Sequence, residues 1–143
     1  MATITSANAA YAIAIANLYP VPQTLQGYAA DDMFVTEAVE LAETIMGADG
    51  KLSAGYIFNP IKQTITIMPD SASLKLFEQW RQAQNTARDV YRCNAVIQLP
   101  GISRKYTLSN GVLSSATPIP GARKTLAPVS FTITWEKVIG EDM

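Results

Sequence analysis

The sequence predicts a mainly β fold, a β-sandwich or barrel that carries one flanking α-helix at about residues 71–87. Residues 9–17 and 129–136 alternate bulky apolar side chains with small or polar ones, which is the period of a half-buried strand. Other short β-rich runs lie between turn residues, and one segment has a convincing helical stripe. Many short strands with one helix favour a sandwich or barrel. We expect residues 1–143 to form a single domain, because 143 residues is the size of one.

The first strand is predicted at residues 9–17, where a tyrosine and two isoleucines alternate with alanines. The bulky face is expected to enter the core, and the alanine face would allow another sheet or subunit to approach closely. Residues 19–22 read Tyr-Pro-Val-Pro and should interrupt the ladder, because proline has no N–H to donate. A short returning strand is predicted at residues 23–28.

Two hairpins are predicted in the next part of the chain. Residues 34–46 fit both a helical stripe and an extended chain, and the family resemblance described below favours a strand. The turn that follows contains Asp49 and Gly50, a pair that supplies the positive φ of a tight hairpin. The β-rich runs at residues 54–58 and 61–68 are predicted to form the second hairpin, joined at an Asn-Pro dipeptide.

The predicted helix spans residues 71–87 and follows a proline, with Asp70 or Ser71 as its N-cap. Apolar residues recur at helical spacing along it, so one face should pack on a sheet. The residues expected on this core face are Leu76, Phe77, Trp80 and Ala83.

The C-terminal part is predicted as three further strands. The first two are expected near residues 91–99 and 105–115, and Asn110-Gly111 within the second is either a hairpin turn or a bulge. Residues 119–128 are predicted as a loop. The last strand, residues 129–136, has the clearest alternation of the chain.

The surface that this composition implies is unusually poor in charge. Charged residues make up 16% of the chain, against about 25% in typical soluble domains, and hydrophobic residues make up 48%. Because buried interface centres are depleted in charge, we expect much of this surface to meet other subunits. No apolar run approaches the roughly 20 residues that span a bilayer, so no membrane partner is expected.

Catalytic chemistry finds little support in the residues. The chain has no histidine, which removes the usual general base and the commonest metal ligand. Asp31 and Asp32 could bind a hard cation with another acid, but acids beside turns are mostly capping residues. Cys93 is expected to be a buried hydrophobe in a reducing compartment. We therefore expect no enzyme, no catalytic residue, no metal and no cofactor.

The distribution of charge is asymmetric. No lysine or arginine precedes Lys51, although that stretch is rich in acids. The acids either form a solvated face or a pattern that orients copies of the chain or repels a polyanion. On one strand, residues three apart alternate faces, so some of these acids must meet water or a basic partner. The acids assigned to a lumen or an inter-subunit contact are Asp31, Asp32, Glu37, Glu40 and Glu43.

Several segments, taken in their order along the chain, resemble the small tail tube proteins of tailed bacteriophages. No single segment is specific alone, but their order is, and the resemblance covers nearly the whole chain from Gln26 onward. The segments are residues 26–32 (QGYAADD), 43–55 (ETIMGADGKLSAG), 63–66 (QTIT), 77–80, 118–120 (PIP) and 131–135 (FTITW).

The resemblance implies a β-sandwich with a flanking helix, hexameric rings that join sheets into a barrel, and stacking of rings into a hollow tube. One extended hairpin would reach the neighbouring ring, and the lumen would be acidic. The implied partners are other copies of the chain, a tape measure protein and double-stranded DNA in the lumen, tail terminator and baseplate proteins at the ends, and a contractile sheath outside if the tail is contractile. The implied location is the tail of a virion assembled in the bacterial cytoplasm.

Two other functions remain open at this point. The tube of a phage-derived injection device, such as a contractile bacteriocin or a type VI secretion system, shares the same ring and fold. A nucleic-acid-binding β-barrel would need aromatic rings beside basic groups, as in single-strand binding grooves. The residues that could form such a groove are Tyr91, Tyr106, Trp135, Arg92, Arg104 and Lys105.

Overall fold

The computed structural model describes residues 9–25, 34–122 and 124–142. In this part the chain is mainly β with one α-helix, as the sequence predicted, and it also has one short 3-10 helix. The elements are β1 (Ala10–Ile15), β2 (Tyr19–Thr24), β3 (Phe34–Thr36), β4 (Ala42–Met46), β5 (Leu52–Tyr56), β6 (Ile61–Ile67), α1 (Leu74–Ala87), β7 (Cys93–Leu99), η1 (Pro100–Ile102), β8 (Arg104–Ala116), β9 (Val129–Trp135) and β10 (Lys137–Asp142).

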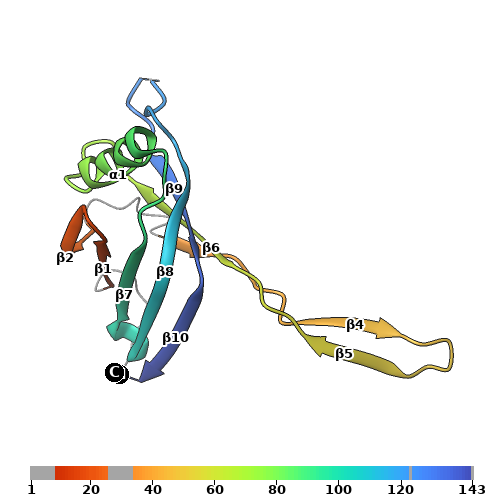
Figure 1. Cartoon of the computed structure of the whole chain (residues 1–143). Helices are drawn as coiled ribbons and strands as arrows, with labels where there is room; N and C mark the ends of the chain where they lie inside the picture. Colours follow the sequence, from red (N-terminus) through yellow and green to blue (C-terminus); the bar gives the residue numbers. More distant parts are fainter. Residues whose placement is uncertain (1–8, 26–33, 123, 143) are drawn as a thin grey trace.

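The body is one sheet that folds into two layers, in the order β2-β1-β7-β8-β9-β6-β3, with β10 also paired to β8. The sheet can fold into two layers because β8 is long enough to belong to both. Its first half pairs with β7 and β10, and its second half pairs with β9. The strands β4 and β5 form a separate two-stranded sheet that projects away from the body (Figure 1).

The core lies between the two layers and follows the period-two pattern of the sequence. The bulky residues of β1 are buried, and every second residue of β9 from Val129 to Trp135 is buried as well. Tyr11 of β1 makes an edge contact with Phe34 of β3, with ring centroids 5.7 Å apart. This contact joins β1 of one layer to β3 at the edge of the other.

A buried polar residue, Gln63 of β6, links four strands through the core. It is only 1% exposed. Its Oε1 accepts hydrogen bonds from the Tyr11 hydroxyl at 2.6 Å and from Trp135 Nε1 at 3.3 Å, and its Nε2 donates to Thr36 Oγ1 at 3.0 Å. A buried amide is tolerated when its donors and acceptor are satisfied, and such a network favours one register of the strands.

The Asn110-Gly111 dipeptide is a bulge in β8 and does not form a hairpin turn. The β7–β8 register shifts by one residue there, and Asn110 has a φ of +54°. The Asn110 N–H donates to Asn94 Oδ1 at 3.0 Å. Gly111 then lies directly against Trp135, because a Cβ at this position would be 2.4 Å from Trp135 Cε3. The bulge therefore brings bare backbone against the largest ring of the core.

The helix α1 begins at Leu74, three residues later than the sequence predicted, and its N-cap is Ser73 in place of Asp70 or Ser71. Local bonds explain the delay, since the Ser73 N–H donates to the Ser71 hydroxyl at 3.1 Å and holds the chain in a turn. Of the apolar stripe, Leu76, Phe77 and Trp80 are buried and Ala83 is half-buried. The Phe77 ring stacks on Phe131 of β9 at 4.4 Å between centroids, which fixes the helix on the sheet.

The prediction that residues 19–22 interrupt the ladder is wrong, because Tyr19 to Pro22 belong to β2. This strand is at the end of the sheet order, where a proline removes no bond from a second neighbour. The β1–β2 register also shifts between Ile13 and Ile15, which accommodates the prolines in an irregularity. The predicted returning strand at residues 23–28 falls partly on β2 and partly outside the described residues.

Of the two predicted central hairpins, the one that turns at Asp49 and Gly50 is confirmed, because β4 pairs with β5 across this turn, but its first strand is shorter than predicted and the second hairpin is wrong in its pairing. Residues 34–46 do not form one strand, because β3 ends at Thr36 and β4 begins at Ala42 in a different sheet. The runs at 54–58 and 61–68 do not pair with each other. Instead β5 pairs with β4, and β6 is already flanked by β3 and β9. The sequence also gave no sign of β10, whose alternation is weak and whose residues are mostly exposed.

Substitution of Gly111 by alanine should destabilise the body. The added methyl group would meet the buried Trp135 ring, and overpacking of this kind costs about 1–3 kcal/mol. The control is Gly55→Ala in β5, where nothing lies within 4 Å of the new Cβ. Urea unfolding of both variants measures the difference. Equal stability of the two would contradict the close contact between Gly111 and Trp135.

Candidate functional site

The projecting hairpin, residues 42–56, is called the arm and is the first candidate surface. Its strands β4 and β5 are joined by a turn in which the Gly47 N–H donates to the Lys51 carbonyl at 2.8 Å. Gly50 has a φ of +87°, and Asp49 Oδ1 accepts a bond from the Lys51 N–H at 3.1 Å. Glycine and aspartate thus hold the tip of the arm in a tight turn.

The register of the arm sorts its side chains into two different faces. Met46 is opposite Leu52, and Ile45 is opposite Ser53. Since side chains alternate along a strand, the face that carries Met46 and Leu52 also carries Ala42, Thr44, Ala54 and Tyr56. This apolar face has no charged residue. The opposite face carries Glu43, Ile45, Ser53 and Gly55.

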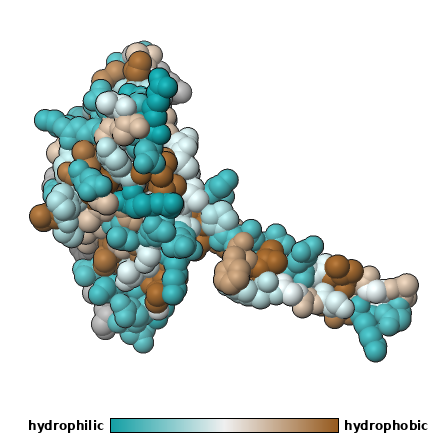
Figure 2. All heavy atoms as spheres, in the orientation of Figure 1, coloured by the Kyte–Doolittle hydropathy of each residue, from teal (hydrophilic) through white to brown (hydrophobic). Residues whose placement is uncertain are grey.

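The apolar face of the arm is open to solvent in the isolated chain. Met46 is 64% exposed, Leu52 is 62% exposed and Tyr56 is 69% exposed. Figure 2 shows hydrophobic residues along the arm as well as on the body. Burial of one such side chain is worth about 1.5–3 kcal/mol, and a lone two-stranded hairpin is marginal in water. The arm therefore gains stability only when another surface covers this face.

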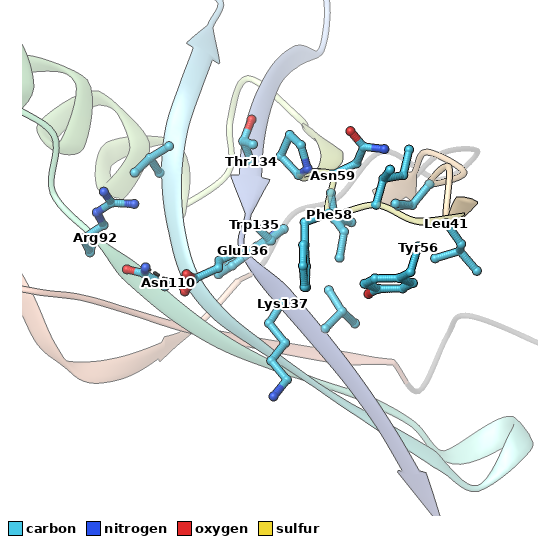
Figure 3. A pocket seen from close by; sticks show the side chains of 16 residues that line it. Leu41, Tyr56, Phe58, Asn59, Arg92, Asn110, Thr134, Trp135, Glu136 and Lys137 are labelled. Atoms are coloured by element: carbon cyan, nitrogen blue, oxygen red, sulfur yellow. Dashed lines mark hydrogen bonds between the residues drawn. The ribbon is translucent and has the colours of Figure 1, made fainter. Parts of the chain in front are cut away.

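A groove at the base of the arm is the second candidate surface. It is called the root groove, encloses about 800 Å³, and is lined by Tyr56 and Phe58 on the arm side and by Val112, Val138 and Arg92 on the body side. Tyr56 and Phe58 make an edge contact with centroids 4.9 Å apart, and Phe58 is 89% exposed. In Figure 3 the groove extends from Leu41 and Tyr56, past Phe58 and Glu136, to Arg92.

The charges of the root groove are only partly paired. Asn110 Nδ2 donates to Glu136 Oε2 at 2.8 Å, which holds that carboxylate against the bulge. Arg92 and Lys137 also line the groove. The ion pairs in the described part of the chain are Arg104 with Asp142 and Lys105 with Glu141, both between β8 and β10, so these two groove cations have no ion-pair partner there.

The acids that the sequence assigned to a lumen or a contact are not gathered in one place. Asp31 and Asp32 lie outside the described residues. Glu37 and Glu40 lie in the connection between β3 and β4, and Glu43 lies in β4; all three are exposed. The expectation that these glutamates alternate along one strand is therefore wrong. The reason is that the chain leaves the β6 ladder after the Glu37 N–H has bonded to the Lys62 carbonyl.

The titratable and metal-ligating side chains of the described residues do not gather into a site. No cluster of three His, Cys, Asp or Glu residues is present in residues 9–25, 34–122 and 124–142. Burial raises the pKa of the Cys93 thiol to about 12, so it stays protonated and unreactive near neutral pH. The hydrogen bond to Asp142 raises the pKa of Arg104, which is a surface effect. No helix among these residues is long and apolar enough to cross a bilayer.

The root groove and the open apolar face of the arm are the features that the sequence did not reveal. The groove combines residues from β5, the β5–β6 connection, β8 and β10, which are far apart along the chain. The exposed face had a partial signal, because the low charge content already predicted contact with other subunits. Periodicity could not say which apolar residues remain outside the core.

Comparisons with known proteins agree with this architecture. Residues 2–139 match the family described as Tail fiber protein gp32. A chain in the baseplate of the anti-feeding prophage is similar, with a TM-score of 0.58, 12% identity, and coverage of 96% of this chain and 95% of that one.

A second similar chain is in the sheath-tube complex of an extracellular contractile injection system, with a TM-score of 0.56 and 14% identity over 93% of this chain and 88% of that one. A third is in the tube terminating cap of the anti-feeding prophage, with a TM-score of 0.55 and 12% identity over 93% and 88%. At these identities the likeness is one of fold. No curated protein sequence matches the chain.

A charge placed on the apolar face of the arm should block association without affecting the body. We expect Leu52→Lys to abolish high-mass species in analytical ultracentrifugation, while thermal unfolding of the body changes by no more than about 0.5 kcal/mol. The matched control is Ser53→Lys, one residue along on the opposite face. Loss of association in both variants, or in neither, would contradict a specific role of the apolar face.

Proposed function

Since the chain belongs to the Tail fiber protein gp32 family, we propose that it is a structural subunit of a phage tail tube that polymerises as stacked hexameric rings. The observation that carries the proposal is the arm, whose apolar face is open and whose strands lack a second layer. A chain built to remain alone would expose neither a long unsupported hairpin nor a charge-poor surface. The function is then mechanical, and no catalytic step is needed.

Polymerisation follows from the kind of contact that the arm makes. The arm is a different surface from the body that it would meet, so the contact is heterologous. Heterologous contacts form a ring when the rotation from one copy to the next adds up to a full turn, and otherwise they continue as a filament. A tube of stacked rings has both kinds of contact, one within each ring and one between rings. Strand β10 pairs only with β8 among the described strands, so its second edge is open for pairing between subunits.

The tube of a phage-derived injection device is the second candidate function. It is favoured by the three structural likenesses, which come from the anti-feeding prophage and an extracellular contractile injection system. The two functions differ in cargo. Purified particles that contain this protein should carry nuclease-protected DNA in an attached head if the chain belongs to a phage, and no head if it belongs to an injection device.

The remaining partners follow from the proposed tube. A tape measure protein and then double-stranded DNA would occupy the lumen, and terminator and baseplate proteins would cover the ends. A contractile sheath would surround the tube if the tail contracts. An acidic lumen would repel phosphate oxygens, so DNA would be cargo and would not be bound. The location would be the virion tail, assembled in the host cytoplasm.

Electron microscopy of the purified protein tests the proposal directly. Rings with a central channel, or tubes built from them, are the expected result. Sedimentation over a concentration series should show a matching loss of the 15.5 kDa species. A monodisperse monomer that persists at high concentration, with no rings in the micrographs, would overturn the proposed function.

The acidic segment is tested by charge reversal. Glu40→Lys should leave tubes intact but make them retain DNA at low salt if this position lines the lumen, because a lysine would attract phosphate. Reversal at a contact between subunits should instead stop stacking at moderate salt. If simultaneous reversal of Glu37, Glu40 and Glu43 changes neither tube formation nor DNA retention, the acids form an inert solvated face.

A further inference from the structure

We propose that the root groove is the receptor for the arm of a second copy of this chain, with the apolar face of that arm seated against Val112, Val138 and Phe58. This inference rests on the proposed function, because it names the surface that the arm meets in the polymer. It also explains why one chain carries both an open apolar face and an open apolar groove.

Size and chemistry match between the two surfaces. The apolar face of the arm presents Met46 and Leu52 directly opposite each other, and both are well over half exposed. A groove of about 800 Å³ accepts several side chains of this size. The exposed Phe58 ring lies between Tyr56 and Glu136 along the groove (Figure 3), where an incoming apolar side chain would cover it.

The arm of the same chain cannot fill the groove along its length. The arm starts at the groove through Tyr56 and extends away from the body (Figure 1). Its distal residues Met46 and Leu52 therefore lie at the far end of the arm from its own groove. A second copy can bring its distal arm to this groove without bending either hairpin, which makes the contact heterologous.

Charge supports the same pairing. The root groove has Arg92 and Lys137 without an ion-pair partner in the described residues, while Glu136 is bonded by Asn110. The arm carries two acids, Glu43 and Asp49, and one base, Lys51, so its net charge is negative. An arm placed against another arm would be repelled, whereas an arm placed in the groove would meet cations.

Disulfide mapping between differently labelled copies tests the inference. Met46→Cys and Val112→Cys are made in separate chains and mixed during assembly, followed by mild oxidation. We expect a covalent band of twice the 15.5 kDa chain mass in the mixture only. Cys93 contributes no background because it is buried.

The control for the mapping is Ile119→Cys, which is 75% exposed in the loop that precedes β9. Its mixture with Met46→Cys should give no covalent band. Tubes in the micrographs together with a Met46–Ile119 band, or with no Met46–Val112 band, would overturn the groove assignment alone. Absence of tubes from the parent protein would instead overturn the proposed function.

A charge exchange gives a second, independent readout. One variant carries Arg92→Glu and Lys137→Glu, so both its arm and its groove are negative. The other carries Glu43→Lys alone, so both its surfaces are net positive and the Asp49 bond that holds the tip of the arm is kept. At low salt each variant alone should lose at least tenfold in polymer yield, and an equal mixture should recover it by alternating the two chains. Failure of the mixture to exceed the separate variants would contradict the pairing.

Discussion

The structure depends on one constraint, which is that an apolar face of a β-sheet must be covered. The body satisfies it internally, since β1 and β9 bury their bulky faces against each other across the core. The arm cannot satisfy it, because β4 and β5 pair only with each other in the described sheets and leave Met46 and Leu52 in solvent. The chain is therefore complete as a fold but incomplete as an assembly unit, and its exposed features follow from that difference.

The strands of the body are fixed relative to one another, and this also fixes the shape of the root groove. Gln63 fixes β1, β3, β6 and β9 in one register through bonds that leave its amide satisfied. The β8 bulge has two consequences on opposite faces of the sheet. Gly111 lets Trp135 close the core, while Asn110 holds Glu136 at the edge of the root groove. A single extra residue thus couples core packing to the shape of the candidate receptor.

The sequence predicted the parts of the fold whose periodicity is local and strong. The alternation in β1 and β9 and the stripe of α1 located these elements, because each needs only its own side chains to define a buried face. The Asp49-Gly50 turn located the hairpin of β4 and β5. Pairing failed for residues 54–58 and 61–68, which alternate much like a hairpin, although β5 pairs with β4 and β6 pairs with β3 and β9. The prolines of β2 led to a wrong prediction, because proline is excluded from the interior strands of a sheet but is allowed in an edge strand. The root groove joins segments distant in sequence and had no local signal at all.

The distribution of charge would give the proposed polymer a direction. Before Lys51 the chain has acids and no bases, and all bases other than Lys51 come from Lys62 onward. Contact between two arms brings carboxylates together, and contact between two grooves brings Arg92 and Lys137 of each copy together, so both symmetric pairings are disfavoured. Only arm against groove combines opposite charges with apolar burial. In the proposed polymer, a low content of charge that is placed unevenly along the chain would therefore disfavour the self-complementary dimer that ends growth and favour the head-to-tail contact that continues it.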